Sequence, residues 1–381
     1  MRMSKRKLTD ICSIQYGCAF DASQFTTLPE EGMPLIRIRD VKDGCTNTYY
    51  KGDYSDEYII HKGDYLVGMD GEFNIEPWQS EDALLNQRVC KIESKSEDVL
   101  MRYIYRFLKK ELKRIEDDTP FVTVKHLSAK RLNQVLISVP PLPEQEKIVS
   151  ELDCLSGIIE KKRQQLKELD ALAQSIFYEM FGNPVDNERG WEVKKLKNVF
   201  SVKIGPFGSL LHHSDYVSGG IPLVNPIHMQ NETICPDNNF TVSEEMIKEL
   251  QNYRLFAGDV IFARRGDIGR CALVRERDNG FLCGTGSLFV RPVQPVDSFF
   301  FVKMMRCESM IEHLTSFAKG ATMLNINCKI IEDLDIILPP LPLQQTFASK
   351  IEAIEKQKAL IKQSLGEVET LFNARMQEYF D

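Results

Sequence analysis

Two long stretches with apolar residues at heptad spacing dominate the hydrophobic pattern of this 381-residue chain. The first runs from Pro143 to about Phe181, and the second from Pro342 to about Phe380. In both, apolar positions recur at alternating steps of four and three residues, which is typical of a coiled-coil seam. A helix of roughly 38 residues would be about 57 Å long. Such a helix is too long to be buried in one compact domain, so we expect it to join or space other parts of the chain.

The two seams share one register, and basic residues interrupt each of them. The first seam contains Ile148, Leu152, Leu155, Ile159, Leu166, Leu169, Ala173, Ile176 and Met180, and the second contains Phe347, Ile351, Ile354, Ile361, Leu365, Val368, Phe372 and Tyr379. Lys162 interrupts the first seam, and Lys358 and Arg375 interrupt the second. We predict that the two stripes pair as an antiparallel coiled coil. The alternative is that each helix packs separately on its own domain.

A proline-rich hinge precedes each long helix. The sequence Val139-Pro-Pro-Leu-Pro-Glu-Gln opens the first, and Leu338-Pro-Pro-Leu-Pro-Leu-Gln opens the second. Proline is tolerated in the first turn of a helix, and acidic residues suit its positive end. Gly182 and Pro184 form a stop signal after the first helix.

The segments before the two hinges are β-rich and repeat one another. In the first we predict strands at Leu35–Arg39, Tyr65–Met69, Arg88–Ile92 and Leu132–Val139, and a helix at Val99–Ile115. Leu196–Gly205 repeats the apolar skeleton of Leu8–Gly17, and Gly258-Asp259 repeats Gly63-Asp64. An internal duplication is the simplest explanation. The polar residues between these apolar positions do not repeat, as expected for one scaffold that carries two different surfaces.

The predicted fold is therefore α+β, with an internal pseudo-two-fold repeat. Two β-rich domains occupy 1–139 and 184–338, and long helices occupy 140–183 and 339–381. If the helices pair antiparallel, each leaves one domain and runs to the other, which gives a rod with a globular unit at each end. Such a molecule suits a long, regular target of fixed pitch, and duplex DNA is the obvious one.

The turn after the Gly-Asp strand has different chemistry in the two repeats. The first turn reads Met69-Asp70-Gly71-Glu72-Phe73-Asn74, with Arg88 after it, and the second reads Arg264-Arg265-Gly266-Asp267-Ile268-Gly269-Arg270. Arginine can bond bidentately to guanine, asparagine to adenine, and carboxylates can accept from cytosine. We predict that Arg264, Arg265 and Arg270 contact DNA bases in one repeat, and that Glu72, Asn74 and Arg88 contribute in the other. The alternative is a surface hairpin with an ion-paired tip.

Other loops are candidates for phosphate contacts. Gly205-Pro206-Phe207-Gly208-Ser209, followed by His212 and His213, could present backbone N–H groups to phosphates. The segments Lys319–Thr322 and Asp118–Thr123 occupy equivalent places before the last strand of each domain, and they are either phosphate-contacting loops or simple turns. A histidine pair indicates a metal site only with a third ligand nearby, and none is evident, so no metal is predicted.

Composition and the absence of known motifs limit the classes of protein to which this chain can belong. The net charge of −7 argues against a wholly basic surface but allows a local DNA-binding face. The ten cysteines are scattered without C-x-x-C spacing, which predicts reduced thiols. There is no long apolar run and no secretory signal, so we expect a cytoplasmic protein without a membrane segment. No G-x-x-x-x-G-K-[ST], G-x-S-x-G or H-E-x-x-H motif occurs, so no catalytic site is predicted.

Taken in order, these segments resemble the specificity subunit of type I restriction-modification systems, the S subunit. The resemblance covers essentially the whole chain. The segments that resemble the family most strongly are the hinges Pro140–Gln145 and Pro339–Gln345. Further segments that resemble it are Gly63-Asp64 to Asn74 with Leu84–Val89, Gly258-Asp259 to Gly269, Gly205–Ser209 and Phe181–Pro184. The second hinge departs slightly from the first, with Leu343 where the first has Glu144.

The resemblance implies that each globular unit is a target recognition domain that reads one half of a bipartite, asymmetric DNA site. The helices would act as a ruler for the unread spacer. They would also dock two modification subunits, which use S-adenosylmethionine to methylate adenine N6. Restriction subunits that use ATP and Mg²⁺ would join the complex, and this chain would hold no cofactor of its own. The helix positions expected to serve partner binding are Ile148, Leu152, Leu155, Ile159, Leu166, Ile351, Ile354, Ile361 and Leu365.

Two alternatives remain at this stage. The specificity subunit of a type IIB restriction-modification enzyme would have the same sequence features but a fused methyltransferase-nuclease as its partner. A coiled-coil adaptor would hold two proteins without touching DNA, and it would show no sequence-dependent DNA retention.

Overall fold

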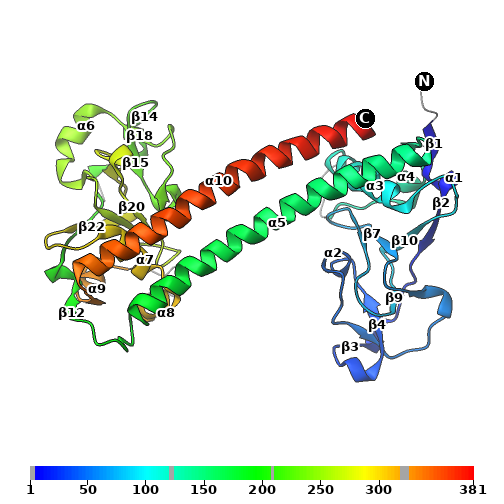
Figure 1. The fold of residues 1–381 in the computed structure, drawn as a ribbon, viewed down its shortest axis with the longest axis horizontal. Coiled ribbons are helices and arrows are strands. Elements are labelled where there is room, and N and C mark those ends of the chain that lie inside the picture. Colours follow the sequence, from blue (N-terminus) through cyan, green and yellow to red (C-terminus); the bar gives the residue numbers. More distant parts are fainter. Residues whose placement is uncertain (1–4, 120–123, 207–209, 318–325) are drawn as a thin grey trace. The chain divides into compact units, whose positions relative to one another are not determined.

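The chain forms two compact units in the computed structural model, which describes residues 5–119, 124–206, 210–317 and 326–381. The first unit comprises residues 1–163 and 363–381, and the second comprises residues 164–362. Helices α5 (Leu142–Phe181) and α10 (Leu341–Phe380) each contribute residues to both units (Figure 1). The first unit is therefore built from two separate stretches of sequence.

The first recognition domain contains a four-stranded antiparallel sheet in the order β2-β10-β7-β8, a five-stranded sheet in the order β3-β5-β4-β9-β6, and the pair β1-β11. Its strands are β1 Lys5–Lys7, β2 Cys12–Tyr16, β3 Phe25–Thr26, β4 Met33–Ile36, β5 Tyr49–Tyr50, β6 Ile59–Ile60, β7 Tyr65–Gly68, β8 Asn74–Pro77, β9 Ala83–Leu85, β10 Val89–Ser94 and β11 Leu136–Ser138. Its helices are α1 Leu8–Ile11, α2 Asp40–Asp43, α3 Met101–Asp117 and α4 Ala129–Asn133.

The second recognition domain repeats the four-stranded sheet and the strand pair of the first, and its other sheets are β14-β18-β15-β21 and β16-β17. The sheet β13-β22-β19-β20 has the strand order of β2-β10-β7-β8, and β12-β23 corresponds to β1-β11. Its strands are β12 Val193–Lys195, β13 Phe200–Ile204, β14 Tyr216–Val217, β15 Ile221–Val224, β16 Met229–Gln230, β17 Thr233–Ile234, β18 Thr241–Val242, β19 Val260–Ala263, β20 Cys271–Leu273, β21 Leu282–Cys283, β22 Ser287–Pro292 and β23 Asp335–Ile337. Its helices are α6 Glu244–Glu249, α7 Ser298–Met305, α8 Glu308–Phe317 and α9 Cys328–Glu332.

Each core contains the ends of both long helices. In the first unit, Ile148, Val149 and Leu152 of α5 and Met376 of α10 pack with the buried face of α3 and with the β2-β10-β7-β8 sheet. In the second unit, the residues that α10 contributes are Phe347, Ala348, Ile351 and Ile354, and α5 contributes Phe177 and Phe181. The helices pair with each other, as predicted, and each also packs on its own domain. The first turns of each helix pack on their own domain, and the end of the other helix packs beside them.

The basic residues that interrupt the second seam form ion pairs with the other helix. In the first unit, Arg375 pairs with Glu151 (2.9 Å), and Arg163 pairs with Glu369 (2.6 Å). From the first pair to the second, the residue number rises along α5, from Glu151 to Arg163, and falls along α10, from Arg375 to Glu369. The two helices are therefore antiparallel there. In the second unit, Lys358 pairs with Asp170 (2.6 Å), while Phe347 packs on Phe177 and Phe181. This order is antiparallel as well.

A buried glutamine joins each hinge to its recognition domain. Gln145 is fully buried, and its Oε1 accepts a hydrogen bond from the Leu100 N–H while its Nε2 donates to the carbonyl of Pro140 (2.7 Å). Gln344 repeats the arrangement with the Asp297 N–H and the carbonyl of Pro339 (2.7 Å). The repeated hinge motif therefore fixes the first turn of each long helix to the start of α3 or α7.

Two strand predictions are corrected. The predicted strand Leu35–Arg39 lies at Met33–Ile36, because the Asp40 carboxylate accepts from the Arg37 N–H and turns the chain into α2. The predicted strand Leu132–Val139 begins only at Leu136, because Ser128 caps the short helix α4 that includes Leu132. Among the described residues, no helix is long and apolar enough to cross a membrane.

Candidate nucleic-acid interface

The turn between β7 and β8 holds most of the residues predicted to contact DNA in the first unit, and Arg88 lies between β9 and β10. Gly71 lies at the tip of the turn with φ 72°. This left-handed conformation favours glycine, which has no Cβ to clash. The Gly71 N–H donates to the carbonyl of Lys125 (2.9 Å), and the Leu127 N–H donates to the carbonyl of Met69 (2.7 Å). Residues 125–127 therefore line the turn like an additional strand and hold its shape.

Asp70, Arg88 and His126 form a polar cluster at this turn. The Asp70 carboxylate lies 2.5 Å from Nδ1 of His126 and 3.5 Å from Nε of Arg88. Arg88 adopts φ 72°, an uncommon backbone conformation for a residue other than glycine. The side chains of Arg88 and His126 are about half exposed. His126 was not predicted from the sequence, because only the pairing of Asp70 with the segment at 125–127 brings it there.

The remaining predicted residues of this turn fall into two groups. Glu72 is exposed and pairs with Lys42 (3.2 Å), and the Asn74 amide donates to the carbonyl of Glu72 (3.0 Å). Met69 and Phe73 are only 6% and 4% exposed and belong to the core of the first unit. The prediction that these two side chains contact DNA therefore needs correction, because they pack beneath the turn instead.

The turn between β19 and β20 occupies the equivalent place in the second unit. The Ile326 N–H donates to the carbonyl of Arg264 (2.9 Å), as Leu127 does to Met69, and the Arg264 N–H donates to the carbonyl of Gly286 (3.0 Å), as Met69 does to Arg88. Gly266 lies at the tip with φ 79°, matching Gly71. The backbone frame is thus repeated, and the side chains on it differ.

The three arginines of the second turn have different environments. Arg264 is half-buried, and its pKa is lowered by burial and by the neighbouring charge of Arg265. Its Nε is buried without a hydrogen-bond partner among the described residues. Arg270 is held by Asp267 (2.8 Å) and by the carbonyl of Pro226 (3.1 Å). Arg265 is exposed and makes no ion pair within the described part of the chain, so it is the arginine most available to an external acceptor.

The glycine-rich loop has a structural role at its first residue. Gly205 donates its N–H to the carbonyl of Ser287 (3.0 Å), so this group is not available to a phosphate. A Cβ at Gly205 would lie 2.0 Å from the carbonyl oxygen of Gly284, which explains the glycine. His212 is exposed, and its N–H donates to Asp215 (2.7 Å). The predicted contacts Gly208, Ser209, Lys319 and Thr322 lie outside the described residues, as do residues 120–123 of the other candidate loop.

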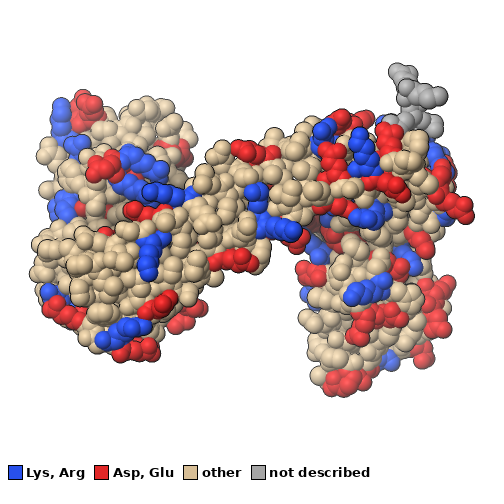
Figure 2. Space-filling model, in the orientation of Figure 1, with Lys and Arg blue, Asp and Glu red and all other residues tan. Residues whose placement is uncertain are grey.

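The helix residues predicted to bind partners are mostly turned inward. Ile148, Leu152, Leu155, Ile351 and Ile354 are buried in the unit cores, and Ile159, Leu166, Ile361 and Leu365 are half-buried. This corrects the prediction that the seam itself is the partner surface. The exposed large apolar residues of these helices are Ile158, Leu172, Leu360 and Leu371. On the face drawn in Figure 2, acidic and basic side chains are interspersed over both units.

The same scaffold occurs in known proteins. The family described as the type I restriction modification DNA specificity domain matches residues 2–170 and, again, residues 188–370. The chain belongs to this family. Each match covers one recognition domain together with most of the long helix that follows it, so the duplicated unit of this chain is the family's domain.

Relatives in this family are similar along most of their length. The chain is 27% identical to the EcoBI specificity subunit of Escherichia coli, with 98% of this chain and 84% of that protein covered. It is 22% identical to the MjaVIII specificity subunit of Methanocaldococcus jannaschii, with 84% and 79% covered.

Solved structures share the fold. The S subunit of a type I restriction-modification system from M. genitalium is 14% identical with a TM-score of 0.60, and the match covers 100% of this chain and 96% of that one. A chain from a study of complex assembly in the type I R-M system is 18% identical with a TM-score of 0.55, covering 100% and 95%.

Proposed function

We propose that this chain is the DNA-recognition subunit of a type I restriction-modification complex and that it reads a bipartite, asymmetric site with one half-site per recognition domain. The observation that carries the proposal is the pair of turns at Met69–Asn74 and Arg264–Arg270. They share one hydrogen-bonded frame within a duplicated family domain, and they present unlike side chains. An identical frame with different polar groups is what two readers of two different half-sites require.

The polar groups of the two turns differ, so the two turns are suited to different DNA bases. The first turn offers Glu72, Asn74 and the cluster of Asp70, Arg88 and His126, which combines donors and acceptors. The second turn offers the exposed Arg265 beside the half-buried Arg264. Arginine favours guanine O6 and N7. The second domain is therefore expected to read a half-site in which a guanine contributes strongly.

Catalysis belongs to the partners in this proposal. Two modification subunits would dock on the helices and methylate adenine N6 with S-adenosylmethionine, and restriction subunits that use ATP and Mg²⁺ would complete the assembly. The exposed Ile158, Leu172, Leu360 and Leu371 are apolar side chains that such partners could cover. The chain itself would bind and position without performing chemistry. Association with partners also accounts for a net charge of −7 in a DNA-binding protein, because phosphate contacts would be shared.

Methylation mapping tests the proposal directly. The full chain is co-expressed with its modification subunit in cells without other adenine methyltransferases, and the methylated adenines of the genome are mapped. The expected result is one motif made of two defined half-sites separated by a spacer of fixed length. The modification subunit expressed alone is the control and should give no such motif.

Two results would count against the proposal. Methylation without a bipartite motif would exclude recognition by two domains. Retention of both partner proteins without any sequence-dependent retention of DNA would favour the coiled-coil adaptor instead.

A further inference from the structure

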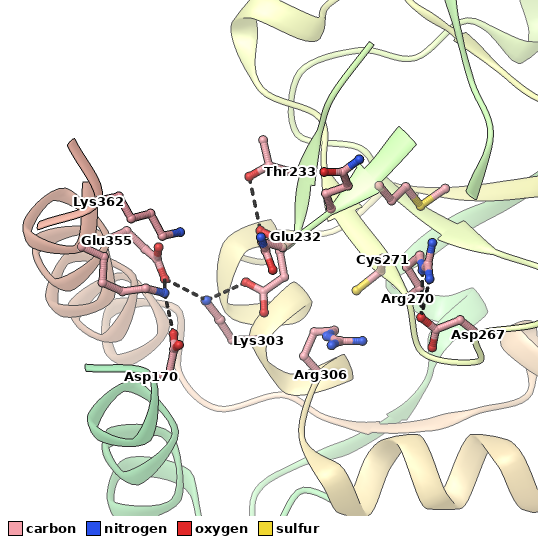
Figure 3. A pocket seen from close by; sticks show the side chains of 14 residues that line it. Asp170, Glu232, Thr233, Asp267, Arg270, Cys271, Lys303, Arg306, Glu355 and Lys362 are labelled. Atoms are coloured by element: carbon pink, nitrogen blue, oxygen red, sulfur yellow. Dashed lines mark hydrogen bonds and ion pairs between the residues drawn. The ribbon is translucent and has the colours of Figure 1, made fainter. Parts of the chain in front are cut away.

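A polar cavity of about 620 Å³ lies in the second unit between the recognition domain and the two long helices (Figure 3). One wall is the β16–β17 hairpin, another is the end of the recognition turn at Asp267–Cys271, and a third is α7. The wall formed by the long helices carries Asp170, Glu355, Lys358 and Lys362. The cavity therefore marks the place where the DNA-reading part of this unit meets its helical support.

The β16–β17 hairpin has an unusual turn. Met229 pairs with Ile234 and Gln230 with Thr233, so the loop contains only Asn231 and Glu232. Both have positive φ, 48° and 61°, as a type I′ turn requires. Asn-Gly is the preferred sequence for this turn, and glutamate in the left-handed region is strained. Glutamate at this position costs backbone strain that glycine would avoid, and the interactions of its side chain can offset that strain.

The Glu232 side chain begins a chain of ion pairs that ends on the long helices. Its carboxylate lies 2.5 Å from Nζ of Lys303 on α7, and Lys303 also lies 3.5 Å from Glu355 on α10. Glu355 lies 3.0 Å from Lys358, and Lys358 lies 2.6 Å from Asp170 on α5. Figure 3 shows Lys303 between Glu232 and Glu355, with Asp170 below them.

Three of these five charges are well shielded from solvent, whereas the side chains of Glu355 and Asp170 are 35% and 64% exposed. The side chains of Lys303 and Lys358 are only 15% and 12% exposed, and that of Glu232 is 22% exposed. Burial alone would lower the pKa of Lys358, but its bonds to Asp170 and Glu355 outweigh burial and raise that pKa. Shielded pairs are screened less by salt and are more sensitive to geometry than surface pairs. This chain of pairs is therefore suited to hold one arrangement of the elements that it joins.

The hairpin is attached to the strand that follows the recognition turn. Strands β16 and β17 pack against β20, and the Leu273 N–H of β20 donates to the carbonyl of Glu232 (3.3 Å). On the other side, Arg270 donates to the carbonyl of Pro226, just before β16. A displacement of the hairpin relative to α7 would thus be passed to Arg270, at the end of the recognition turn, and to Leu273, which follows it.

The first unit contains a corresponding connection. Glu76 on β8, the strand after the first recognition turn, pairs with Lys109 of α3 (2.8 Å) and accepts from Tyr105 (2.8 Å). From the same helix, Arg106 reaches Asp153 (2.9 Å) and Ser156 (3.0 Å) on α5. Both units therefore place charged residues of an intervening helix between a long helix and the strands near the recognition turn. The paths differ: in the first unit the link starts on β8 itself, and in the second it starts on the β16–β17 hairpin, which packs against β20.

We propose that Glu232 and Lys303 are positioning residues that restrict this protein to a single length of DNA spacer, by fixing the second recognition turn to α5 and α10. The inference rests on the proposed function. Neither residue need touch DNA. The helices determine the distance available, and the ion-pair chain determines how strictly the recognition turn holds its place on them.

Glu232→Gly and Lys303→Met separate this role from a general effect on folding. Glu232→Gly creates the preferred Asn-Gly turn, so the hairpin should remain folded while the carboxylate is lost. Lys303→Met removes the charge but keeps a long apolar side chain. Lys303→Arg retains both ion pairs and is the conservative variant. Lys248→Met on α6, an exposed lysine of the same domain, is the matched control for loss of a charge.

The experiment uses the full chain co-expressed with its modification subunit and a plasmid library. In the library, the two half-sites of the wild-type motif are separated by spacers from two base pairs shorter to two base pairs longer. Adenine methylation is read for every spacer. Wild type, Lys303→Arg and Lys248→Met should methylate one spacer length strongly. Glu232→Gly and Lys303→Met should methylate the adjacent lengths as well, with discrimination reduced about tenfold, or about 1.4 kcal/mol.

The outcomes are distinguishable. Unchanged spacer discrimination in Glu232→Gly and Lys303→Met would overturn the positioning role while leaving the proposed function intact. Weaker methylation at every spacer, together with a lower unfolding midpoint, would show a merely structural role and would overturn the inference as well. If the wild type itself gives no bipartite motif, both the proposed function and this inference fail.

Discussion

Arg264 and Arg265 are neighbours in one turn, yet only one of them faces solvent freely. Arg265 is exposed, whereas Arg264 is half-buried with its Nε unpaired among the described residues. An unpaired buried donor is costly, so a position that retains one is a candidate for function. At the scale of single residues, the second turn therefore combines an accessible cation with one held partly out of water.

Replacement of Arg265 by alanine should impair recognition of the second half-site. If its guanidinium contacts a base, the expected loss is about 1–3 kcal/mol with relaxed preference at one position. If it contacts a phosphate, methylation should weaken uniformly across sequences. Methylome sequencing of cells that carry Arg265→Ala and the modification subunit distinguishes these outcomes. Arg277→Ala, at another exposed arginine of the same domain, should have no effect. Normal methylation in Arg265→Ala would remove this residue from the interface.

Replacement of Gln344 by methionine should destabilise the second unit. The change leaves the Asp297 N–H and the Pro339 carbonyl without their side-chain partner in a buried site. The expected cost is about 1–3 kcal/mol. Urea unfolding followed by circular dichroism measures it. Gln345→Met, at the exposed neighbouring position, is the control and should be close to neutral. Equal midpoints for both variants would contradict the role assigned to the buried amide.

The stability of the second unit should fall in mild acid because of His228. This side chain is 3% exposed, its Nδ1 accepts from the Asn225 N–H (3.1 Å), and burial lowers its pKa. In the unfolded chain it would take up a proton near pH 6.5, and in the folded chain only at lower pH. The unfolded state therefore binds more protons as pH falls through about 6.5, and folding loses stability.

Urea unfolding of wild type and His228→Gln at pH 7.5 and pH 5.5 checks this contribution. The wild type should lose more stability between the two pH values than the variant does. An identical loss in both would show that other groups cause the pH dependence.

At the scale of elements, aromatic packing joins α5 and α10 to the second core. Phe347 is fully buried and contacts the rings of Phe177, Phe181 and Phe300 with centroid distances of 5.3–6.2 Å. Phe177 and Phe181 come from α5, and Phe300 comes from α7. One side chain of α10 therefore holds together three helices.

Replacement of Phe347 by alanine should cost about 3–5 kcal/mol in the free energy of unfolding of the second unit. The loss arises from the removed apolar contacts and from the cavity left among the three rings. Leu360 on the same helix is 68% exposed. Its replacement by alanine should therefore change stability by less than about 0.5 kcal/mol. Thermal unfolding of both variants provides the comparison, and a loss below about 1 kcal/mol for Phe347→Ala would mean that the rings repack.

Elements in which apolar residues recur at a regular period could be predicted from the sequence. Turns set by single side-chain hydrogen bonds could not. The heptad pattern identified α5 and α10, and the helical spacing at Ile104, Phe107 and Leu108 identified α3. The shift of β4 depended on the Asp40 carboxylate, whose bond to the Arg37 N–H has no periodic signature. His126 and Glu232 were missed for a related reason. Their partners are distant in sequence, and only the fold brings them together.

At the scale of the whole molecule, the length of the paired helices should set the spacing that the two recognition domains can span. Each helix contains 40 residues. At the usual rise per residue this is a length of about 60 Å. Deletion of one heptad from the middle of each helix keeps the seam in register and removes about 10 Å.

The double heptad deletion should change or abolish recognition of the normal spacer while each domain keeps its half-site preference. Methylation of the variable-spacer library measures the effect. Deletion of a heptad from only one helix breaks the register and should abolish activity at all spacers, which distinguishes a shortened helix pair from a misfolded one. An unchanged spacer after the double deletion would exclude the helices as the ruler.

The return of α10 to the first unit also determines the order in which the protein can be completed during synthesis. The first core includes Met376, with Phe372, Tyr379 and Phe380 packed against it, although the rest of that buried core lies between Leu8 and Leu152 in the sequence. A chain emerging from the ribosome would expose this apolar site until the second unit and nearly all of α10 had been made. Of the two recognition domains, the one synthesised earlier is therefore the later to close, and an incomplete chain would display an open core that chaperones and proteases can recognise.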